Sequence, residues 1–309
     1  MKLAKQAPQL QQPAEQAGQA MQIKQATVKR ANRTGAPYTP GMLILELLMI
    51  ALAVAFFFPL YITFVNGLKT YQEVVVSTVS LPHVFQFKNF GTVWKQINFL
   101  GVFINSLIVT VVSVGGILLI SSAAAYQLVR RPGRISQIIF LAILSSLVIP
   151  FQTMMVPLVK VAKDMGLIDT LYGLIIMYWG FGIPLALFLY HGFIKSIPRE
   201  LEEAAHIDGS GTAGVYFRIL LPLLKPITTT IAILQALWIW NDFLLPLITL
   251  NAKENQTIPL AASVYFGQYT NEWHLAMAAL TMAIIPIILF FLSMQRYIIQ
   301  GITAGAVKG

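Results

Sequence analysis

Six long apolar stretches, separated by shorter polar segments, dominate the pattern of this chain. They cover residues 42–68, 102–128, 135–158, 171–193, 227–250 and 275–297. A helix of about 20 apolar residues crosses the roughly 30 Å hydrocarbon layer of a bilayer, and it satisfies its own backbone hydrogen bonds there. We therefore predict an all-α membrane protein with six transmembrane helices. Pro59, Pro150 and Pro157 are expected to bend the first and third of them.

The polar segments divide the chain into three regions. Residues 1–40 are rich in Gln, Ala and Lys and are expected to form a disordered cytoplasmic tail; a short helix that touches lipid headgroups or a partner is the alternative. Residues 41–300 form the transmembrane domain, with a polar loop at 196–226, and residues 301–309 form a C-terminal cytoplasmic tail. The two longest loops on the opposite side are 69–100, where a helix is expected to begin near Lys88, and 251–274.

The charged residues orient the helices. Only 11% of the 309 residues are charged, against about 25% in soluble domains. Of the 21 Lys and Arg residues, fifteen belong to the two ends and to the loops on the same side as the ends. Because cytoplasmic loops carry the excess of basic residues, both termini and the 196–226 loop are predicted to be cytoplasmic. The basic residues are divided among loops and do not gather on one folded face, so no nucleic-acid partner is expected.

The sequence lacks the motifs of a catalytic or metal site. It has no cysteine, and its four histidines, His83, His191, His206 and His274, are scattered, so we expect no metal ion. A Gly-Lys-Ser/Thr phosphate loop, a Gly-x-Ser-x-Gly elbow and a His-Glu-x-x-His pair are all missing. We expect a non-enzymatic chain with no catalytic residue and no bound cofactor.

The 196–226 loop has the pattern of a short helix followed by a turn. Ser196 is expected to cap the helix, Pro198 suits its first turn, and Gly209 suits its end. The spacing predicts that four residues share one small, shallow face. They are Leu201, Ala204, Ala205 and Asp208. A helix lying on lipid would carry Trp, Phe or Leu with Lys and Arg, whereas this one is acidic and rich in Ala, which favours docking of a soluble protein.

Seven residues of this loop match a family pattern. The positions are Glu203-Ala204-Ala205, Gly209, Ile219 and Leu221-Pro222. They resemble the EAA loop of ABC-importer permeases: Glu-Ala-Ala, three residues, Gly, nine residues, Ile, one residue, Leu-Pro. Outside the loop, Trp240-Asn241-Asp242 and the 301–309 tail are similar to the carbohydrate branch of that family. The likeness covers about residues 40–309 and is closest to the second permease subunit of maltose-type and multiple-sugar importers.

This resemblance implies a type I ABC-importer permease fold with a cytoplasmic coupling helix, in a multi-pass protein of the bacterial inner (plasma) membrane. The implied function is binding-protein-dependent import of a di- or oligosaccharide. The implied partners are a homologous second permease in a heterodimer, two ATPase subunits that use ATP and Mg, an extracytoplasmic solute-binding protein and membrane lipid. The residues implied to dock the ATPases are Glu203, Ala204, Ala205, Asp208, Gly209, Gly305 and Ala306. Those implied to contact the binding protein are Gly267, Gln268 and Tyr269.

Polar side chains inside apolar stretches are candidates for a substrate path, because they are costly in lipid and often face a cavity. The candidates are Asn105, Gln152, Tyr178, Asn241 and Asp242. For the aromatic ring the alternative is helix packing or an interfacial belt. For Asn241 and Asp242 it is a helix–helix hydrogen bond or a break in the fifth span.

Three other functions remain open from the sequence. The same type of importer could carry another solute such as glycerol phosphate, which a pair of path-facing Arg or Lys would favour; the spans contain none. A secondary transporter would show inverted repeats and paired intramembrane acids, and only Asp242 is a candidate. If the chain were a non-transporting membrane scaffold, its deletion would leave the stimulation of ATPase activity by a loaded binding protein unchanged.

Overall fold

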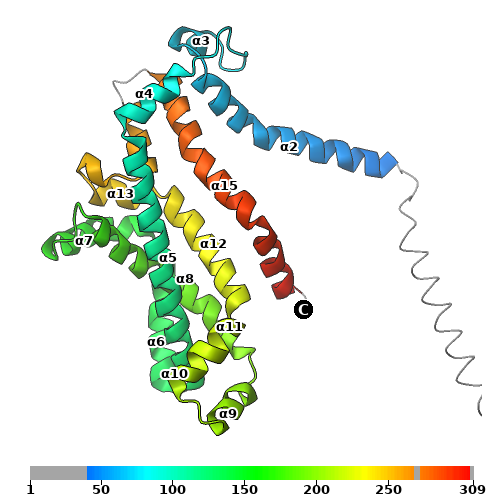
Figure 1. The fold of residues 1–309 in the computed structure, drawn as a ribbon, viewed down its shortest axis with the longest axis vertical. Coiled ribbons are helices and arrows are strands. Elements are labelled where there is room, and N and C mark those ends of the chain that lie inside the picture. Colours follow the sequence, from blue (N-terminus) through cyan, green and yellow to red (C-terminus); the bar gives the residue numbers. More distant parts are fainter. Residues whose placement is uncertain (1–39, 268–271, 307–309) are drawn as a thin grey trace, which may run out of the picture. The chain divides into compact units, whose positions relative to one another are not determined.

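The computed structural model describes residues 40–267 and 272–306, and these contain helices and loops without any strand. Four helices are long and apolar enough to cross a membrane: α2 (Pro40–Gly67), α5 (Phe99–Arg130), α8 (Leu171–Lys195) and the Trp273–Ser293 part of α15 (Trp273–Ala306) (Figure 1). Two bent helix pairs would raise the number of spans to six if each pair is one span. The chain divides into compact units at 1–59 and 60–309, and the following paragraphs concern the second unit.

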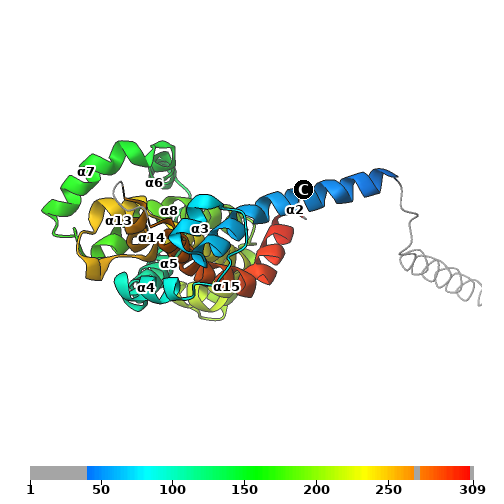
Figure 2. The ribbon, with the colours of Figure 1, turned by 90° about the horizontal axis from the view of Figure 1, so that it is seen from above.

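The third apolar stretch, expected as one proline-bent span at 135–158, is divided into two helices. It consists of α6 (Arg134–Ser145), the 3₁₀ turn η1 (Ser146–Val148) and α7 (Phe151–Asp164), and the two arms are bent by 108°. Pro150 has no N–H to donate and keeps the preceding residue extended; Ile149 accordingly has φ −82° and ψ 118°. The second arm, α7, lies at the edge of the helix group (Figure 2), where Phe151 packs against Phe181 of α8 and Ala162 is buried. Pro157 lies inside α7 without ending it.

The fifth stretch is also broken. The segment before it consists of α10 (Thr212–Val215), a π-helical turn η2 (Tyr216–Leu220) and α11 (Leu221–Leu223), and it meets α12 (Lys225–Asn241), the first helix of the stretch, at 73°. The extended backbone of Asp242, with ψ 130°, then separates α12 from α13 (Leu244–Thr249). The expected span at 227–250 is therefore one helix followed by a short second one.

Short helices fill the two long loops, and one extends the last span. The loop at 69–100 contains α3 (Tyr71–Val76) and α4 (Lys88–Gln96), which begins at Lys88 as expected. The loop at 251–274 contains η3 (Lys253–Asn255), α14 (Ile258–Ala262) and η4 (Ser263–Phe266). Because α15 continues to Ala306, residues 301–306 are helical. The predictions for 1–39 and for the last three residues fall outside the described residues.

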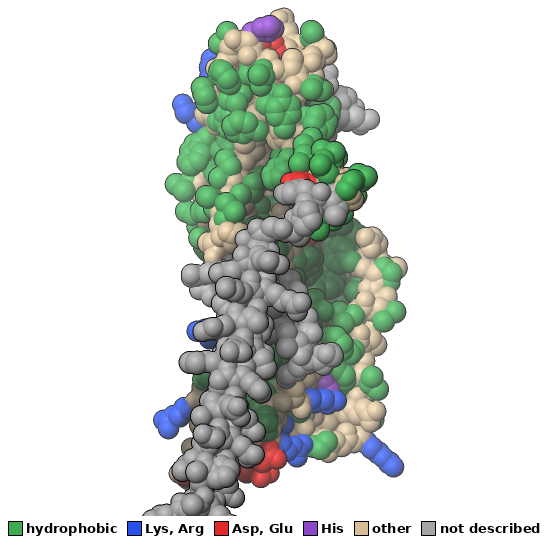
Figure 3. All heavy atoms as spheres, turned by 90° about the vertical axis from the view of Figure 1, so that its right-hand side faces the viewer, with side chains coloured by type: hydrophobic (Ala, Val, Ile, Leu, Met, Phe, Trp, Pro, Cys, Tyr) green, Lys and Arg blue, Asp and Glu red, His purple; other side chains and the backbone are tan. Residues whose placement is uncertain are grey.

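Close packing of α5 on α8 forms the centre of the larger hydrophobic core. A Cβ placed on Gly116 would lie 2.2 Å from Trp179 Nε1, and one on Gly182 would lie 2.3 Å from Ile117 Cδ1. Small residues therefore let the two helices approach, as expected for helices in lipid. A second core joins α4, α14 and α15. On the face seen in Figure 3, hydrophobic side chains cover most of the described surface, and most of the visible Lys and Arg lie near its lower end.

Candidate functional site

The predicted docking helix is α9 (Glu200–Ile207), which follows α8 after a short turn. Three acidic residues, Glu200, Glu202 and Glu203, occupy its first turn and stabilise the positive end of the helix dipole. The expected cap was wrong: Arg199 precedes the helix, and the Ser196 hydroxyl donates to the Phe193 carbonyl at 2.8 Å, at the end of α8. Ser196 lies at the C-cap of α8, four residues before Glu200, whereas an N-cap residue directly precedes the first helical residue.

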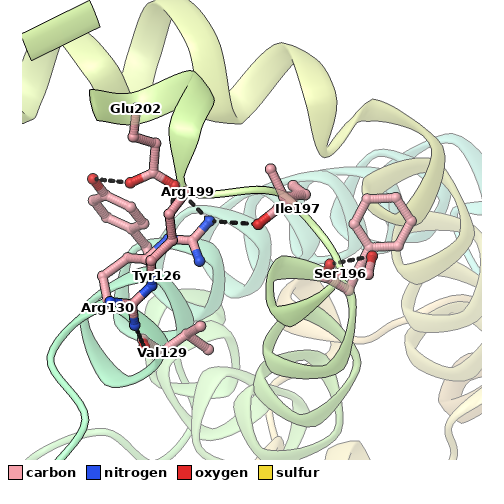
Figure 4. A network of polar contacts seen from close by, with 8 residues as sticks. Tyr126, Val129, Arg130, Ser196, Ile197, Arg199 and Glu202 are labelled. Carbon is pink, nitrogen blue, oxygen red and sulfur yellow. Dashed lines mark hydrogen bonds and ion pairs between the residues drawn. The ribbon is translucent and has the colours of Figure 1, made fainter. Parts of the chain in front are cut away.

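Glu202 attaches α9 to the end of α5. Its Oε1 accepts from Arg130 Nε at 2.7 Å and pairs with Arg130 Nη2 at 2.6 Å, while Oε2 accepts from the Tyr126 hydroxyl at 3.1 Å (Figure 4). Arg130 Nη2 also donates to the Ile197 carbonyl at 3.1 Å. The side chains of Arg130 and Glu202 are only 12% and 9% exposed. Charge-assisted bonds of this kind are stronger than neutral ones, so α9 has a defined orientation on α5.

Three further contacts strengthen this attachment. Arg199 Nη2 donates to the Val129 carbonyl at 3.4 Å, next to the ion pair. On η2, the Tyr216 hydroxyl lies 2.7 Å from Ser122 Oγ, and the Tyr216 ring packs against the Tyr126 ring at 5.7 Å between centroids. The end of α5 therefore holds both α9 and the helical turn that follows it.

The outward face of α9 differs in part from the predicted one. Ala205 is only 6% exposed and faces the body of the chain together with Glu202. Glu203, Ala204 and Asp208 are exposed, as is Leu201 at 46%. The Leu201–Ala204–Ala205–Asp208 face is thus wrong in one member, because burial of Glu202 turns the residue three positions later inward as well.

Gly209 ends α9 in the way that the sequence predicts. Its φ is +84°, a region that favours glycine. The Gly209 N–H donates to the His206 carbonyl at 3.0 Å and the Ser210 N–H donates to the Ala205 carbonyl at 2.9 Å, which is the bond pattern of a Schellman motif. Gly305 and Ala306, also predicted to dock the ATPases, are in the last turn of α15; their side chains lie outside the described residues, and their role stays a prediction.

Two of the predicted path residues meet between α8 and the break in the fifth stretch. The Tyr178 hydroxyl, on a fully buried ring, donates to Asp242 Oδ2 at 2.9 Å. Asp242 Oδ1 accepts from the Leu244 N–H at 3.1 Å and so holds the start of α13. The Tyr178 ring packs edge-on against Trp238 at 5.6 Å. The alternative from the sequence, a helix–helix hydrogen bond at a break in the span, accounts for these contacts.

The other path candidates occupy different surroundings. Asn241 is exposed, donates to the Leu237 carbonyl at 2.7 Å, and lines a cavity of about 390 Å³ with Trp240, Ser263 and Phe266. Gln152 is exposed near the start of α7. Asn105 donates to the carbonyls of Glu254 and Gln256 at 2.7 and 3.0 Å, so its amide group is occupied by the 251–274 loop.

Two of the three residues predicted to contact the binding protein lie outside the described residues. Gly267 follows η4, whereas Gln268 and Tyr269 lie outside the described residues. Within the described ranges no three His, Asp or Glu residues approach closely enough to hold a metal ion. The residues that sequence reasoning missed are Glu202 and Arg130 as a pair. The three-residue spacing of Glu202 and Ala205 allows both to lie on one buried face, but the sequence of α9 alone does not favour burial of this face over the other faces of the helix.

The chain is similar to several known proteins. Residues 116–304 match the family described as binding-protein-dependent transport system inner membrane component. The chain is 42% identical to the probable starch degradation products transport system permease protein AmyC of Thermoanaerobacterium thermosulfurigenes, over 86% of this chain and 96% of that protein. It is 39% identical to the melibiose/raffinose/stachyose import permease protein MelC of Bacillus subtilis, over 88% and 98% of the two chains. A chain in the crystal structure of a bacterial ABC transporter involved in the import of the acidic polysaccharide alginate has the same fold, with a TM-score of 0.70 and 24% identity over 85% of this chain and 99% of that one.

Proposed function

Because this chain belongs to the family of inner membrane components of binding-protein-dependent transport systems, we propose that it is a permease subunit that partner ATPases drive through α9 during import of a neutral di- or oligosaccharide. It pairs with a homologous second permease in a heterodimer. Two ATPase subunits use ATP and Mg on the cytoplasmic side, and an extracytoplasmic binding protein delivers the sugar. In this arrangement α9 and both termini are cytoplasmic, and six spans, two of them bent, cross the membrane.

The observation that carries the proposal is the two-sided construction of α9. Its inner face is attached by the buried Glu202–Arg130 pair, while Glu203, Ala204 and Asp208 remain exposed. The small side chain of Ala204 lets another protein approach the backbone closely there. A displacement of α9 by a soluble subunit would pass to α5 through charge-assisted bonds, and rigid-body movement of packed helices is an established type of conformational change.

Oligosaccharides are favoured over phosphorylated solutes by the distribution of basic residues. Within α5, α8 and α12, Lys and Arg occur only at helix ends, at Arg130, Lys195 and Lys225. A phosphate path would present Arg or Lys inside the spans. The relatives AmyC and MelC are named for starch degradation products and for melibiose, raffinose and stachyose, which are neutral sugars. The cavity beside Asn241, with the rings of Trp240 and Phe266, is the part of the path that we assign to this subunit.

The substrate class is tested by uptake into proteoliposomes that contain the complete importer. We expect uptake of at least one of melibiose, raffinose and maltotriose, and no uptake of glycerol 3-phosphate. Uptake of glycerol 3-phosphate alone would contradict the substrate class. Sugar uptake without the ATPases, driven by an ion gradient, would identify a secondary transporter instead.

The role of α9 is tested by two glycine substitutions on the same turn. Gly209→Val forces a branched residue into a left-handed conformation that costs about 1–2 kcal/mol, and Cβ branching raises that cost. Gly211→Ala is the control, since Gly211 has φ −70° and a Cβ added there would meet no atom within 4 Å. We expect Gly209→Val to abolish sugar uptake while membrane insertion stays normal, and Gly211→Ala to retain uptake. Normal uptake by Gly209→Val would argue strongly against docking through α9.

A further inference from the structure

Asp169 holds the beginning of the 251–274 loop. It lies just before α8 with φ +61°. Its Oδ1 accepts from the N–H groups of both Asn251 and Ala252 at 2.9 Å. Its own N–H donates to the Thr249 carbonyl at 2.7 Å, and its carbonyl accepts from Asn255 Nδ2 at 2.6 Å. Four hydrogen bonds from one residue in a left-handed conformation connect the α7–α8 turn to segment 249–255. An Asp at positive φ is uncommon and indicates that the surroundings determine the conformation.

The next part of the same loop is held by α5. Asn105 donates both amide hydrogens to carbonyls of the loop, at Glu254 and Gln256. Ser106 Oγ, on the following residue, accepts from the Ile258 N–H at 2.9 Å. Each of these contacts joins residues about 150 positions apart in the chain. The loop from 249 to 258 is therefore held along its length by side chains of α5 and of the turn before α8.

The helices that hold this loop are also those that hold α9. Asn105 and Arg130 are on one continuous α-helix, about 37 Å apart along its axis at 1.5 Å per residue. The other helix, α8, begins beside Asp169 and ends at Lys195, five residues before α9 begins. Close contact at Gly116 and Gly182 locks α5 against α8. In Figure 1 the two ends of α5 lie near α4 and near α10, so the pair connects opposite ends of the transmembrane unit.

We propose that Asp169 and Asn105 are positioning residues that fix segment 249–258 to the α5–α8 pair, so that the extracytoplasmic binding protein, on contacting this loop, acts on the same two helices that carry α9. This inference rests on the proposed function, because it assigns the loop to the binding-protein side. It adds the residues that transmit the contact. Without the two side chains the loop would keep the Ser106–Ile258 bond to α5, but the coupling of a binding-protein contact to α5 and α8 would be weaker.

The test uses the complete importer in lipid nanodiscs: this chain, the second permease and both ATPases. ATPase activity is measured against the concentration of the purified binding protein, saturated with the sugar that gives the highest uptake. We expect Asp169→Ala to raise the binding-protein concentration for half-maximal stimulation by at least about tenfold, which corresponds to about 1.4 kcal/mol. Basal ATPase activity should stay within about twofold of the wild type, because α9 remains attached. Asp169→Asn keeps an acceptor oxygen at Oδ1 and should restore the half-maximal concentration to within about threefold.

Asp164→Ala is the matched control, because Asp164 is an exposed acid at the end of α7, five residues earlier. It should leave the half-maximal concentration unchanged. If Asp169→Ala does not assemble, Asn255→Ala removes one bond to Asp169 and Asn105→Ala removes the bonds from α5 to the same loop, and each should raise the concentration. An unchanged half-maximal concentration in these variants, or a lower maximal rate alone, would overturn the inference. If the binding protein still stimulates the wild-type complex, the proposed function stands. A wild-type complex that the binding protein does not stimulate would overturn both.

Discussion

The buried ion pair between α9 and α5 gives a quantitative prediction for Glu202→Ala. The substitution removes three contacts of one carboxylate, with Arg130 Nε, Arg130 Nη2 and the Tyr126 hydroxyl. Arg130 keeps its bond to the Ile197 carbonyl but loses its counter-charge. Because α9 is only eight residues long, it is too short to be stable without tertiary contacts. Loss of the pair should therefore release α9 locally and leave the long helices folded.

The expected free-energy change follows from burial. Removing one partner of a buried ion pair costs about 3–5 kcal/mol, because the remaining charge is left without compensation. Since the two side chains keep 12% and 9% exposure, we expect the lower limit of that range, about 3 kcal/mol. At about 1.4 kcal/mol per factor of ten, the population of released α9 should rise more than about hundredfold.

The assay is native-state hydrogen exchange of the α9 backbone amides in the permease pair without ATPases. Glu203→Ala is a control on the adjacent residue: Glu203 is exposed, and an exposed charge contributes at most about 1 kcal/mol. We expect faster exchange of the Ala204 to Asp208 amides in Glu202→Ala and little change in Glu203→Ala. With the ATPases present, the Glu203 variant should in turn weaken docking, because its side chain faces outward.

A double-mutant cycle completes the test. If the pair acts as a unit, Arg130→Ala combined with Glu202→Ala should cost at least about 1.5 kcal/mol less than the two single changes added together. The reasoning would be refuted if Glu202→Ala altered α9 exchange no more than Glu203→Ala does. Strict additivity in the cycle would refute it too, because independent side chains show no coupling.

Two further predictions concern packing and pH. Gly116→Ala should destabilise the chain by about 1–3 kcal/mol in SDS unfolding, because its Cβ would lie 2.2 Å from Trp179 Nε1. Gly115→Ala is the control, because a Cβ there would meet no atom within 4 Å. Equal unfolding midpoints for the two variants would show that α5 and α8 are not closely packed at Gly116. The N–H groups of Ala252 and Asn251 lower the pKa of Asp169 below its ordinary value of 3.8. The hydrogen bonds of the Asp169 carboxylate to the loop are therefore fully present above pH 3.8, and they are lost only as the pH falls through the lower pKa of the folded state. Exchange protection of those two amides, corrected for intrinsic rates, should stay constant from about pH 8 to about pH 5; a loss of protection between these values would contradict the assignment.

The membrane class and most helix positions could be predicted from sequence because they depend on local properties. Long apolar runs become helices in lipid whatever their neighbours are, and α2, α5, α8 and α15 lie where such runs occur. The same holds for Gly209, because a residue with φ of +84° is strongly selected for glycine at that position alone. The seven residues of the loop pattern, from Glu203 to Pro222, likewise pointed to the correct family.

What required the tertiary structure is the orientation and partnership of polar side chains. The sequence of α9 allows several inward faces, and the one observed depends on Arg130, 72 residues before Glu202 in the chain. Asn105 is a polar residue inside an apolar stretch, which made it a candidate for the substrate path, yet its amide group donates to carbonyls 149 and 151 residues away in the chain. The 108° angle of the bend at Pro150 also required the tertiary structure, because proline permits a bend while packing sets its angle. A buried polar group needs a partner wherever the fold provides one, and a partner so distant in the chain leaves no periodic signal near the residue itself.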